Sequence, residues 1–353
     1  KSHCGGLVAP ESDDNPWHYK ITWNPRNIVM AGKAGAIYKL NGKEIAEQYE
    51  TLFEADRTVL TGNEEVPVLS YYPNRNSLPY IDLYGLGEAS TFIRTTLRYR
   101  DFMYGWKNIV ELKLTDEEPV YQTDGLSLQD FFKEHLLKNG FGDWLNNKLS
   151  ERLSETKAML ENLMKIAEAE NIAQVEGEPV EDEFMLVNEE GHLKSIQLED
   201  VKNDATSVVA LKMHEANLTM KQLFFLGLDD QDTIINKGLC SAADVLQMAL
   251  EKKLALQQGD KDMIVMLHEI AYKDKEGKAQ SIHSSLLVKG EDSIHTAMAK
   301  TVGLPLGIAA KLILEKKINL TGIHIPVCKE IYEPVLTELK NLGISFSESR
   351  DIL

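Results

Sequence analysis

Residues 263–270 read MIVMLHEI, and a turn at 275–277 and a second strand-like stretch at 281–288 follow them. Both stretches carry the apolar and β-branched residues that favour strands. A long interval with a helical period precedes them in the chain. The pattern predicts a sheet that the chain leaves for a helical insertion and then rejoins.

Stretches nearer the beginning of the chain predict further strands. Ala36–Leu40 and Lys43–Ile45 flank the dipeptide Asn41-Gly42, which tolerates the positive φ of a two-residue hairpin turn. Val66–Tyr72 and Ala89–Tyr99 are rich in β-branched and aromatic residues. We therefore expect the first hundred residues to contribute to a sheet.

Capping signals and periodicity predict the helices. From about Phe102 the apolar residues recur with a helical period, and an acidic, proline-interrupted run at 176–183 predicts a solvated loop. The helices expected from capping signals are a short one that Asn24 caps before Pro25 and that runs through Met30, a long amphipathic one from Asp143 to about residue 164, and one that a Ser241–Asp244 capping box opens and that runs through about Leu256.

The last sixty residues alternate between helix and strand signals. The expected elements are a helix from about Ser293, a second helix over Gly307–Lys316 beyond Leu304-Pro305, a short strand at Ile323–Val327, a helix at 329–342 and a strand-like Ile344–Phe346. Such alternation predicts a piece of an α/β layer whose other strands are absent from this chain.

Composition limits the kinds of partner. The net charge of −17 argues against nucleic acid and anionic membranes, which require a basic surface. No run approaches the ~18 apolar residues of a membrane span, and the first residues are no signal peptide, so a soluble, cytoplasmic protein is expected. The three cysteines (Cys4, Cys240 and Cys328) are far apart, which indicates neither a disulfide framework nor a zinc site.

The stretch Arg94–Arg100 concentrates arginine in an acidic protein, and Arg75 lies about twenty residues before it. In an extended chain Arg94, Thr96, Arg98 and Arg100 lie on one side. Guanidinium binds carboxylate through two parallel hydrogen bonds, so this side suits a polycarboxylate ligand. The alternative is that the arginines pair with surface Asp and Glu.

Two further residues have open roles. Cys4 next to His3 is either a nucleophile beside its base, or simply neighbours Gly5-Gly6, whose backbone lets a ligand or another chain approach closely. His268, in an apolar strand, is either a hydrogen-bonded structural residue or an acid–base group. No dinucleotide glycine fingerprint, Walker loop or HExxH motif occurs, and the chain opens without Met, which suggests a piece of a longer protein.

Several motifs together resemble a known family. The segment from Cys4 through Trp23, with Cys4–Leu7, Ala9–Glu11, Asp14–Pro16 and Tyr19-Lys20, resembles the start of the C-terminal region of saccharopine dehydrogenases of the glutamate-forming type. Similar matches follow in order at 72–77, 96–99, 261–263, 297–305 and 330–335. The resemblance is weak between about 113 and 235.

The resemblance implies an oxidoreductase of lysine metabolism. It would pass a hydride from the secondary-amine carbon of saccharopine to NAD or NADP, and the resulting imine would hydrolyse to glutamate and 2-aminoadipate 6-semialdehyde. The implied fold is α+β, with a mixed-sheet substrate domain, a helical insertion and a C-terminal α/β return to an absent Rossmann domain. The implied boundaries are 1–112 and 236–304 for the substrate domain, 113–235 for the insertion and 305–353 for the return segment.

The resemblance also implies site residues. Arg75, Thr96, Leu97 and Arg98 match the family's substrate-binding positions. Cys4, Gly5 and Gly6 match a turn near the nicotinamide, and Asn24 stands at a cofactor-contacting position where the family usually has serine. The family's proton-transferring groups are expected mostly on the absent domain, so no catalytic acid or base is named, and the fragment alone is expected to be inactive. No metal is implied, and a homodimer is one expected assembly.

Other functions stay open at this point. A related carboxy-polyamine dehydrogenase is the alternative enzyme. A stand-alone module that senses a dicarboxylic amino acid without chemistry is an alternative of another class, and a helical interaction scaffold would depend only on residues 113–235.

Overall fold

The computed structural model describes residues 1–54, 56–148 and 217–352, together with 150, 151, 154, 183–187, 193–197, 211 and 213–215. The chain forms two compact units, one of Lys1–Leu126 with Ile234–Leu353 and one of Ser127–Thr233. The domain boundaries expected from the sequence stay predictions. Each unit is described by itself.

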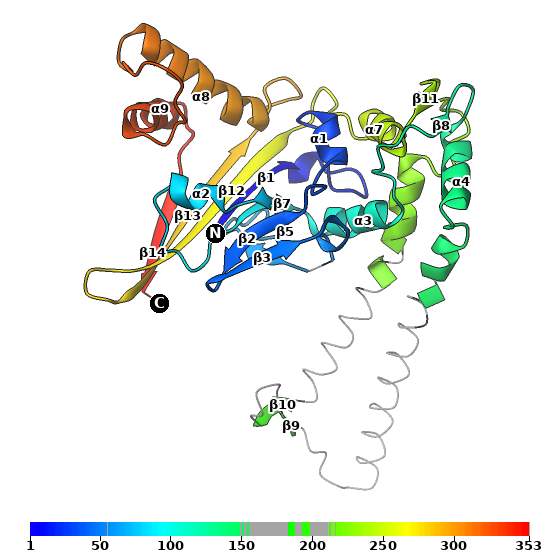
Figure 1. The fold of residues 1–353 in the computed structure, drawn as a ribbon, viewed down its shortest axis with the longest axis horizontal. Helices are drawn as coiled ribbons and strands as arrows, with labels where there is room; N and C mark the ends of the chain where they lie inside the picture. Colours follow the sequence, from blue (N-terminus) through cyan, green and yellow to red (C-terminus); the bar gives the residue numbers. More distant parts are fainter. Residues whose placement is uncertain are drawn as a thin grey trace. The chain divides into compact units, whose positions relative to one another are not determined.

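The larger unit is built on a seven-stranded sheet (Figure 1). Its strand order is β14-β13-β12-β1-β7-β5-β4, and only the β1–β7 pair is parallel within this sheet. The bounds are β1 Ser2–Val8, β4 Thr58–Leu60, β5 Val68–Pro73, β7 Arg94–Arg98, β12 Asp262–Lys273, β13 Ala279–Lys289 and β14 Ser347–Ile352. The strands expected at 263–270 and 281–288 are thus confirmed, and their hairpin extends beyond β1, which pairs with β12 only as far as His268 (Figure 1).

The sheet is mixed and curled. Thr58–Gly62 at one edge and Ser347, Ser349 and Asp351 at the other line a single hollow of 650 Å³, so the two edges curl toward each other. One face packs a core of Leu7, Val66, Leu69, Leu97, Met263 and Val265. On the other face, Ile264, Leu286 and Val288 pack with Ala297. The expected mixed α/β architecture is confirmed.

A smaller three-stranded sheet adjoins the first strands. It has the order β3-β2-β6, with β2 Ala36–Leu40, β3 Lys43–Glu47 and β6 Arg75–Asn76. Asn41 and Gly42 have φ values of 49° and 81°, which confirms the predicted hairpin turn. The stretch expected as a strand from Ala89 forms strand β7 only from Arg94, because the chain before it turns at Leu86–Ala89 and only Phe92 makes a bridge, to Lys39.

Two helices of the larger unit begin at the capping signals predicted for them. α1 spans Pro25–Val29 and α7 spans Ala242–Lys253, and both predicted caps are present, with Ser241 and Asp244 exchanging hydrogen bonds. The other helices of this part of the unit are α2 (Pro79–Leu83) and α3 (Arg100–Glu111). The short elements are the 3₁₀ turns Pro10–Ser12 and Tyr49–Thr51 and the strand pair of β8 (Tyr121–Gln122) with β11 (Leu239–Cys240).

The second unit contains α4 (Leu128–Lys138), which Ser127 caps, and an antiparallel pair of β9 (Glu183–Val187) with β10 (Leu193–Gln197). Phe131 and Phe132 of α4 are buried. The predicted amphipathic helix from Asp143 and the acidic loop at 176–183 lie mostly outside the described residues.

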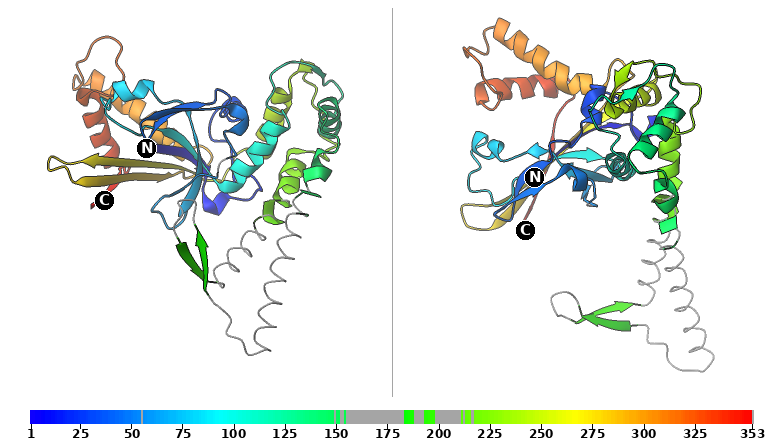
Figure 2. Two further views of the ribbon diagram at one scale, coloured as in Figure 1. Left: turned by 60° about the horizontal axis from the view of Figure 1, so that its bottom comes forward. Right: turned by 45° about the vertical axis from the view of Figure 1, so that its right-hand side comes forward.

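The C-terminal part differs from expectation. A single helix, α8 (Ala297–Leu314), contains Pro305, so the predicted break at Leu304-Pro305 is wrong. Proline removes one backbone donor and crowds the carbonyl of the preceding turn, but Ile308 and Leu312 beyond it pack against α9 (Lys329–Asn341), which holds the helix together. Figure 2 shows α8 and α9 lying side by side.

Two strand predictions near the end of the chain are also wrong: one strand is absent, and the other begins later than expected. Residues 323–327 form no strand, and the Ile323 side chain is 102% exposed. Ile344 instead packs against the α8–α9 core, so strand pairing begins only at Ser347, where β14 joins β13.

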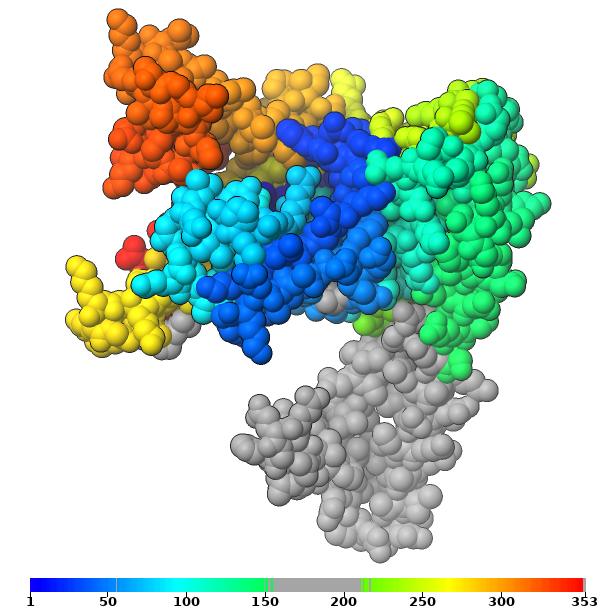
Figure 3. All heavy atoms as spheres, viewed as in Figure 1, coloured from blue at the N-terminus to red at the C-terminus, as the bar shows by residue number. Residues whose placement is uncertain are grey.

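Helix α8 is the one described helix that is long and apolar enough to cross a membrane, and 17% of it is buried. The expectation that no run approaches a membrane span is therefore wrong on length and composition. Figure 3 shows α8 and α9 (orange to red) projecting from the rest of the unit with much of their surface open.

A fully buried carboxylate ties α8 to the sheet. Asp262, at the start of β12, is 0% exposed and accepts hydrogen bonds from the backbone N–H groups of Ala297 (2.6 Å) and Met298 (3.0 Å). These donors belong to the first turn of a helix and have no intrahelical partner. Gly290 leaves room for the Asp262 side chain, because a Cβ there would collide with Asp262 Oδ1.

We predict that Asp262→Asn lowers the free energy of unfolding by about 1–3 kcal/mol, because an amide cannot accept from both N–H groups and leaves one buried donor unpaired. Urea titration of the chain measures this difference. Asp82→Asn, at an exposed position in α2, serves as the control and should change stability by less than about 0.5 kcal/mol. Equal midpoints for the two variants would contradict the role of Asp262.

Candidate ligand site on the central strands

The register of β1 with its neighbours defines one continuous face. Ser2 and Cys4 of β1 lie beside Arg94 and Thr96 of β7, and on the other side beside His268 and Met266 of β12. Since side chains alternate along a strand, the side chains of these six residues and of Arg98 lie on the same face, which we call the Cys4 face. The pairing of β1 with β7 therefore brings Cys4, Thr96 and Arg98 onto one face.

Arg98 is held by its own neighbours. Its Nη1 donates to the carbonyls of Leu97 (2.8 Å) and Gly6 (3.3 Å), and its guanidinium lies 5.2 Å from the centre of the Tyr19 ring and 5.4 Å from that of Phe102. The two rings pack against each other with centroids 5.1 Å apart. These contacts fix the guanidinium, and neither ring was identified from the sequence as part of a site.

The remaining edge of Arg98 has no acceptor in the part of the chain that the structure describes. Nε is buried without a hydrogen-bond partner, and Nη2 makes no hydrogen bond or ion pair there. Nε and Nη2 are the pair of donors that binds a carboxylate side-on. A buried donor left unpaired costs free energy, so this edge is suited to an acidic ligand.

Arg75 lies at the other end of β7. Asn74 donates its backbone N–H to the carbonyl of Arg94 (2.8 Å), which places Arg75 beside the start of that strand, about 13 Å along the strand from Arg98. Its side chain is exposed and has no ion pair with any described residue, and its φ is 53°. The two predicted arginines thus mark the two ends of one strand.

The other arginines of the stretch have local partners. Arg94 stacks on the ring of Tyr80, 3.9 Å from its centre. Arg100 begins α3 and pairs with Asp56 (2.6 Å), so the expectation that it shares the face of Arg98 is wrong. The helix starts immediately after Tyr99 and ends the alternation there.

Thr96 and Leu97 have different positions. The half-buried Thr96 side chain lies on the Cys4 face, whereas the fully buried Leu97 side chain belongs to the core on the opposite face. Only backbone groups of Leu97 are left to meet a ligand, and its carbonyl already accepts from Arg98.

The predicted cofactor residues lie on β1 and at the start of α1. Cys4 is exposed, although burial by surrounding protein raises the pKa of its thiol, and the charge of Arg98 opposes that shift. Asn24 Oδ1 accepts from the backbone N–H of Arg26 (2.9 Å) as a helix cap, so its amide NH₂ is the group left for a ligand.

His3 does not act on Cys4. It points to the opposite face, is 0% exposed, and bonds Thr95 Oγ1 (2.7 Å) and Glu269 Oε2 (3.0 Å) through its two ring nitrogens. The hydrogen bond from His3 lowers the pKa of Glu269 to about 2. The nucleophile–base alternative for Cys4 and His3 is therefore wrong.

A second histidine, not identified from the sequence, packs on the ring of Tyr99, the residue after Arg98. His18 bonds Asp13 through Nδ1 (2.5 Å) and Asp101 through Nε2 (3.2 Å), and its ring packs on Tyr99 at 5.8 Å. The hydrogen bonds with Asp101 and Asp13 raise the pKa of His18 to about 10. The available signal was the acidic pair Asp13-Asp14, but sequence could not show that α3 supplies the second carboxylate.

Gly5 determines how closely β1 and β7 approach. A Cβ at this position would lie 2.7 Å from both the Cβ and the carbonyl oxygen of Leu97. We predict that Gly5→Ala lowers the free energy of unfolding by about 1–3 kcal/mol through overpacking. Chemical denaturation measures the change, and Gly87→Ala, which has open space around its Cβ, should leave stability nearly unchanged. Comparable losses in both variants would rule out the steric explanation.

The raised pKa of His18 predicts a pH-dependent stability. Because the pKa of about 10 in the folded protein exceeds the ordinary 6.5, the stabilisation is complete below pH 6.5, declines above it and is lost once the pH passes 10. His18→Asn, which tolerates the φ of 47°, should thus be less stable than the parent at pH 6 and equally stable near pH 11. Unfolding curves across this range measure the difference, and an imidazole titrating near pH 6.5 by NMR would contradict it.

Comparisons with known proteins follow this geometry. Residues 1–344 match the family described as the saccharopine dehydrogenase C-terminal domain. The chain is 30% identical to an alpha-aminoadipic semialdehyde synthase of Arabidopsis thaliana, over 99% of this chain and 29% of the relative. It is 28% identical to a saccharopine dehydrogenase [NADP(+), L-glutamate-forming] of Pyricularia oryzae, over 98% of this chain and 65% of the relative.

A solved structure has a similar fold. Apo saccharopine dehydrogenase (L-Glu forming) from Saccharomyces cerevisiae superposes with a TM-score of 0.70 at 24% identity, covering 99% of this chain and 66% of that one. The chain spans about a third of the length of the semialdehyde synthases and about two thirds of the length of the fungal dehydrogenases that it matches. On these matches, the chain belongs to the saccharopine dehydrogenase C-terminal domain family.

Proposed function

We propose that this chain is the substrate-binding part of a saccharopine dehydrogenase, which oxidises saccharopine to glutamate and 2-aminoadipate 6-semialdehyde with NADP or NAD. The proposal combines the family membership with one structural observation. Arg98 is fixed by two rings and two carbonyls, and its Nε–Nη2 edge has no acceptor within the described chain.

The arginines suit a long substrate with several carboxylates. Arg98 would take one carboxylate side-on, and Thr96 beside it offers a hydroxyl on the same face. Arg75, at the other end of β7, would take a second carboxylate. Holding both ends of the substrate fixes the position of the carbon between them, which is the contribution of binding groups to hydride transfer.

The groups near β1 fit the rim of a nicotinamide site. Exposed Cys4 and the free amide of Asn24 offer contacts to a flat ring. The chain has no glycine fingerprint to hold the cofactor phosphates. When bound, the nicotinamide supplies the hydride acceptor; this chain's residues bind and orient the substrate.

The apolar surface of the C-terminal segment is suited to packing against a further domain. Helices α8 and α9 and the loop between them expose many large apolar side chains, and an apolar hollow of 590 Å³ lies between them. The exposed residues include Leu306, Ile313, Leu314, Ile323, Ile325 and Leu342. We propose that residues 305–353 pack against an amino-terminal Rossmann domain. In this division of the chain, residues 1–112 and 236–304 form the substrate domain and residues 113–235 form the insertion. A stand-alone sensing module would leave this surface in water.

In the intact enzyme, we predict that Arg98→Ala raises KM for saccharopine and lowers kcat/KM by about 30- to 700-fold, equivalent to about 2–4 kcal/mol. Arg98→Lys should recover only part of this, because an ammonium group cannot form the side-on pair. Steady-state kinetics with saccharopine measure both values.

Arg100→Ala is the matched control, since Arg100 lies in the same stretch but pairs with Asp56 at the surface. Its kinetics should stay close to those of the parent. Unchanged KM and kcat in Arg98→Ala would refute the substrate role. Faster turnover of a carboxy-polyamine than of saccharopine would instead favour the related dehydrogenase.

A further inference from the structure

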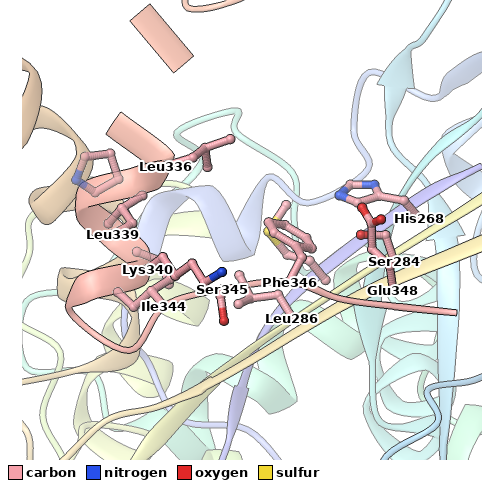
Figure 4. A pocket seen from close by; sticks show the side chains of 13 residues that line it. His268, Ser284, Leu286, Leu336, Leu339, Lys340, Ile344, Ser345, Phe346 and Glu348 are labelled. Carbon is pink, nitrogen blue, oxygen red and sulfur yellow. The ribbon is translucent and has the colours of Figure 1, made fainter. Parts of the chain in front are cut away.

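A second hollow continues the Cys4 face toward the end of the chain. It has a volume of 690 Å³, which is within the range of small-ligand sites. Strands β12, β13 and β14 form one side, α8 and α9 form the other, and residues 344–346 cross between them (Figure 4). We call this hollow the α9 pocket.

Strand register connects the α9 pocket to the Cys4 face. Ser2 pairs with His268, His268 with Ser284, and Ser284 with Glu348, which forms a row of polar side chains across four strands. Cys4 pairs with Met266, and Met266 with Leu286, which forms an apolar row beside the first. The pocket therefore has a polar margin and an apolar floor.

Two opposite charges, both on exposed residues, line the α9 pocket without partners among the residues that the structure describes. Neither Lys340 of α9 nor Glu348 of β14 makes an ion pair or side-chain hydrogen bond with any residue that the structure describes. Figure 4 shows Lys340 with Ser345 on one side of Phe346, and Glu348 with His268 and Ser284 on the other. The two charges are thus separated by apolar surface from Phe346 and Leu286.

His268 completes the acidic end of the pocket. Its ring lies 5.5 Å from that of Phe346, and burial lowers its pKa, so it is neutral at pH 7 and adds no positive charge beside Glu348. This arrangement would attract a cation to Glu348 and an anion to Lys340. A ligand with only one of these charges would leave the other side chain unpaired.

We propose that the α9 pocket binds a linear aliphatic amino acid, with its ammonium at Glu348 and Ser284, its carboxylate at Lys340 and Ser345, and its methylene chain on Met266, Leu286 and Phe346. The ligand is either a free amino acid or the amino-acid arm of a larger substrate held by the Cys4 face. The proposal rests on the pocket's charges and does not require Arg98 to bind a carboxylate.

Calorimetry on the intact protein with 6-aminohexanoate tests the proposal. We expect saturable binding, and at least 10-fold weaker binding of hexylamine and of hexanoate, each of which lacks one charge. Lys340→Ala should weaken binding of 6-aminohexanoate at least 10-fold and leave hexylamine unaffected. Glu348→Gln should also weaken binding of 6-aminohexanoate at least 10-fold, but should leave binding of hexanoate unaffected. The matched controls are Lys329→Ala and Glu330→Gln, at exposed positions in the first turn of α9, and both should bind 6-aminohexanoate like the parent.

Competition with saccharopine then identifies the source of the ligand. If the pocket holds an arm of the substrate, 6-aminohexanoate inhibits competitively, and Lys340→Ala and Glu348→Gln raise KM for saccharopine. If it holds a free amino acid, 6-aminohexanoate and saccharopine bind at the same time, and the KM for saccharopine stays unchanged in both variants. Equal affinity for the three probes, or 6-aminohexanoate binding that neither variant alters, would overturn the proposal. Binding is measured without turnover, so loss of the proposed dehydrogenase activity would not affect this test.

Discussion

The close approach of β1 and β7 at Gly5 determines the geometry of the candidate site. A side chain at Gly5 would collide with Leu97, so the absence of a Cβ allows Leu97 to pack directly against β1 and fill the core below it. The next residue, Arg98, then reaches the carbonyl of Gly6 on the opposite face. One missing side chain in the core is thus linked, through strand alternation, to the position of a guanidinium on the functional face.

The environment of Arg98 explains why it can serve a ligand while other arginines of the same stretch cannot. Arg100 satisfies its charge with Asp56 at the surface, and Arg94 with the ring of Tyr80. Arg98 meets two carbonyls and two aromatic rings, which stabilise a cation without neutralising it. Its charge is therefore retained in an acidic protein, where a carboxylate partner would otherwise be easy to find.

Local signals in the sequence predicted local structure well. The Asn41-Gly42 turn, the Asn24 cap and the Ser241–Asp244 capping box each depend on a few neighbouring residues, and all are present. The predictions failed where distant segments decide the outcome. Pro305 does not break α8 because the sheet holds its first turn and α9 holds the part beyond the proline, and Arg100 leaves the strand because α3 begins there.

The same distinction applies to the candidate site. Alternation within one strand placed Thr96 and Arg98 together, but Tyr19, Phe102 and the His18 contact with Asp101 come from separate segments that meet only in the folded chain. The residues of the α9 pocket were equally hidden, since Glu348 reaches His268 only through the pairing of β14 with β13 and of β13 with β12.

The apolar surface of α8 and α9 follows from how these helices are attached to the sheet. Asp262 fixes the first turn of α8, and Ala297 packs on β12 and β13, but from about Leu304 the helix packs mainly with α9 and with Ile318 and Ile344. Much of the apolar surface of the pair, including Leu306, Ile313 and Leu314, is therefore left exposed. A domain that covered this pair, as proposed for residues 305–353, would remove this apolar surface from water and would thereby stabilise the C-terminal segment.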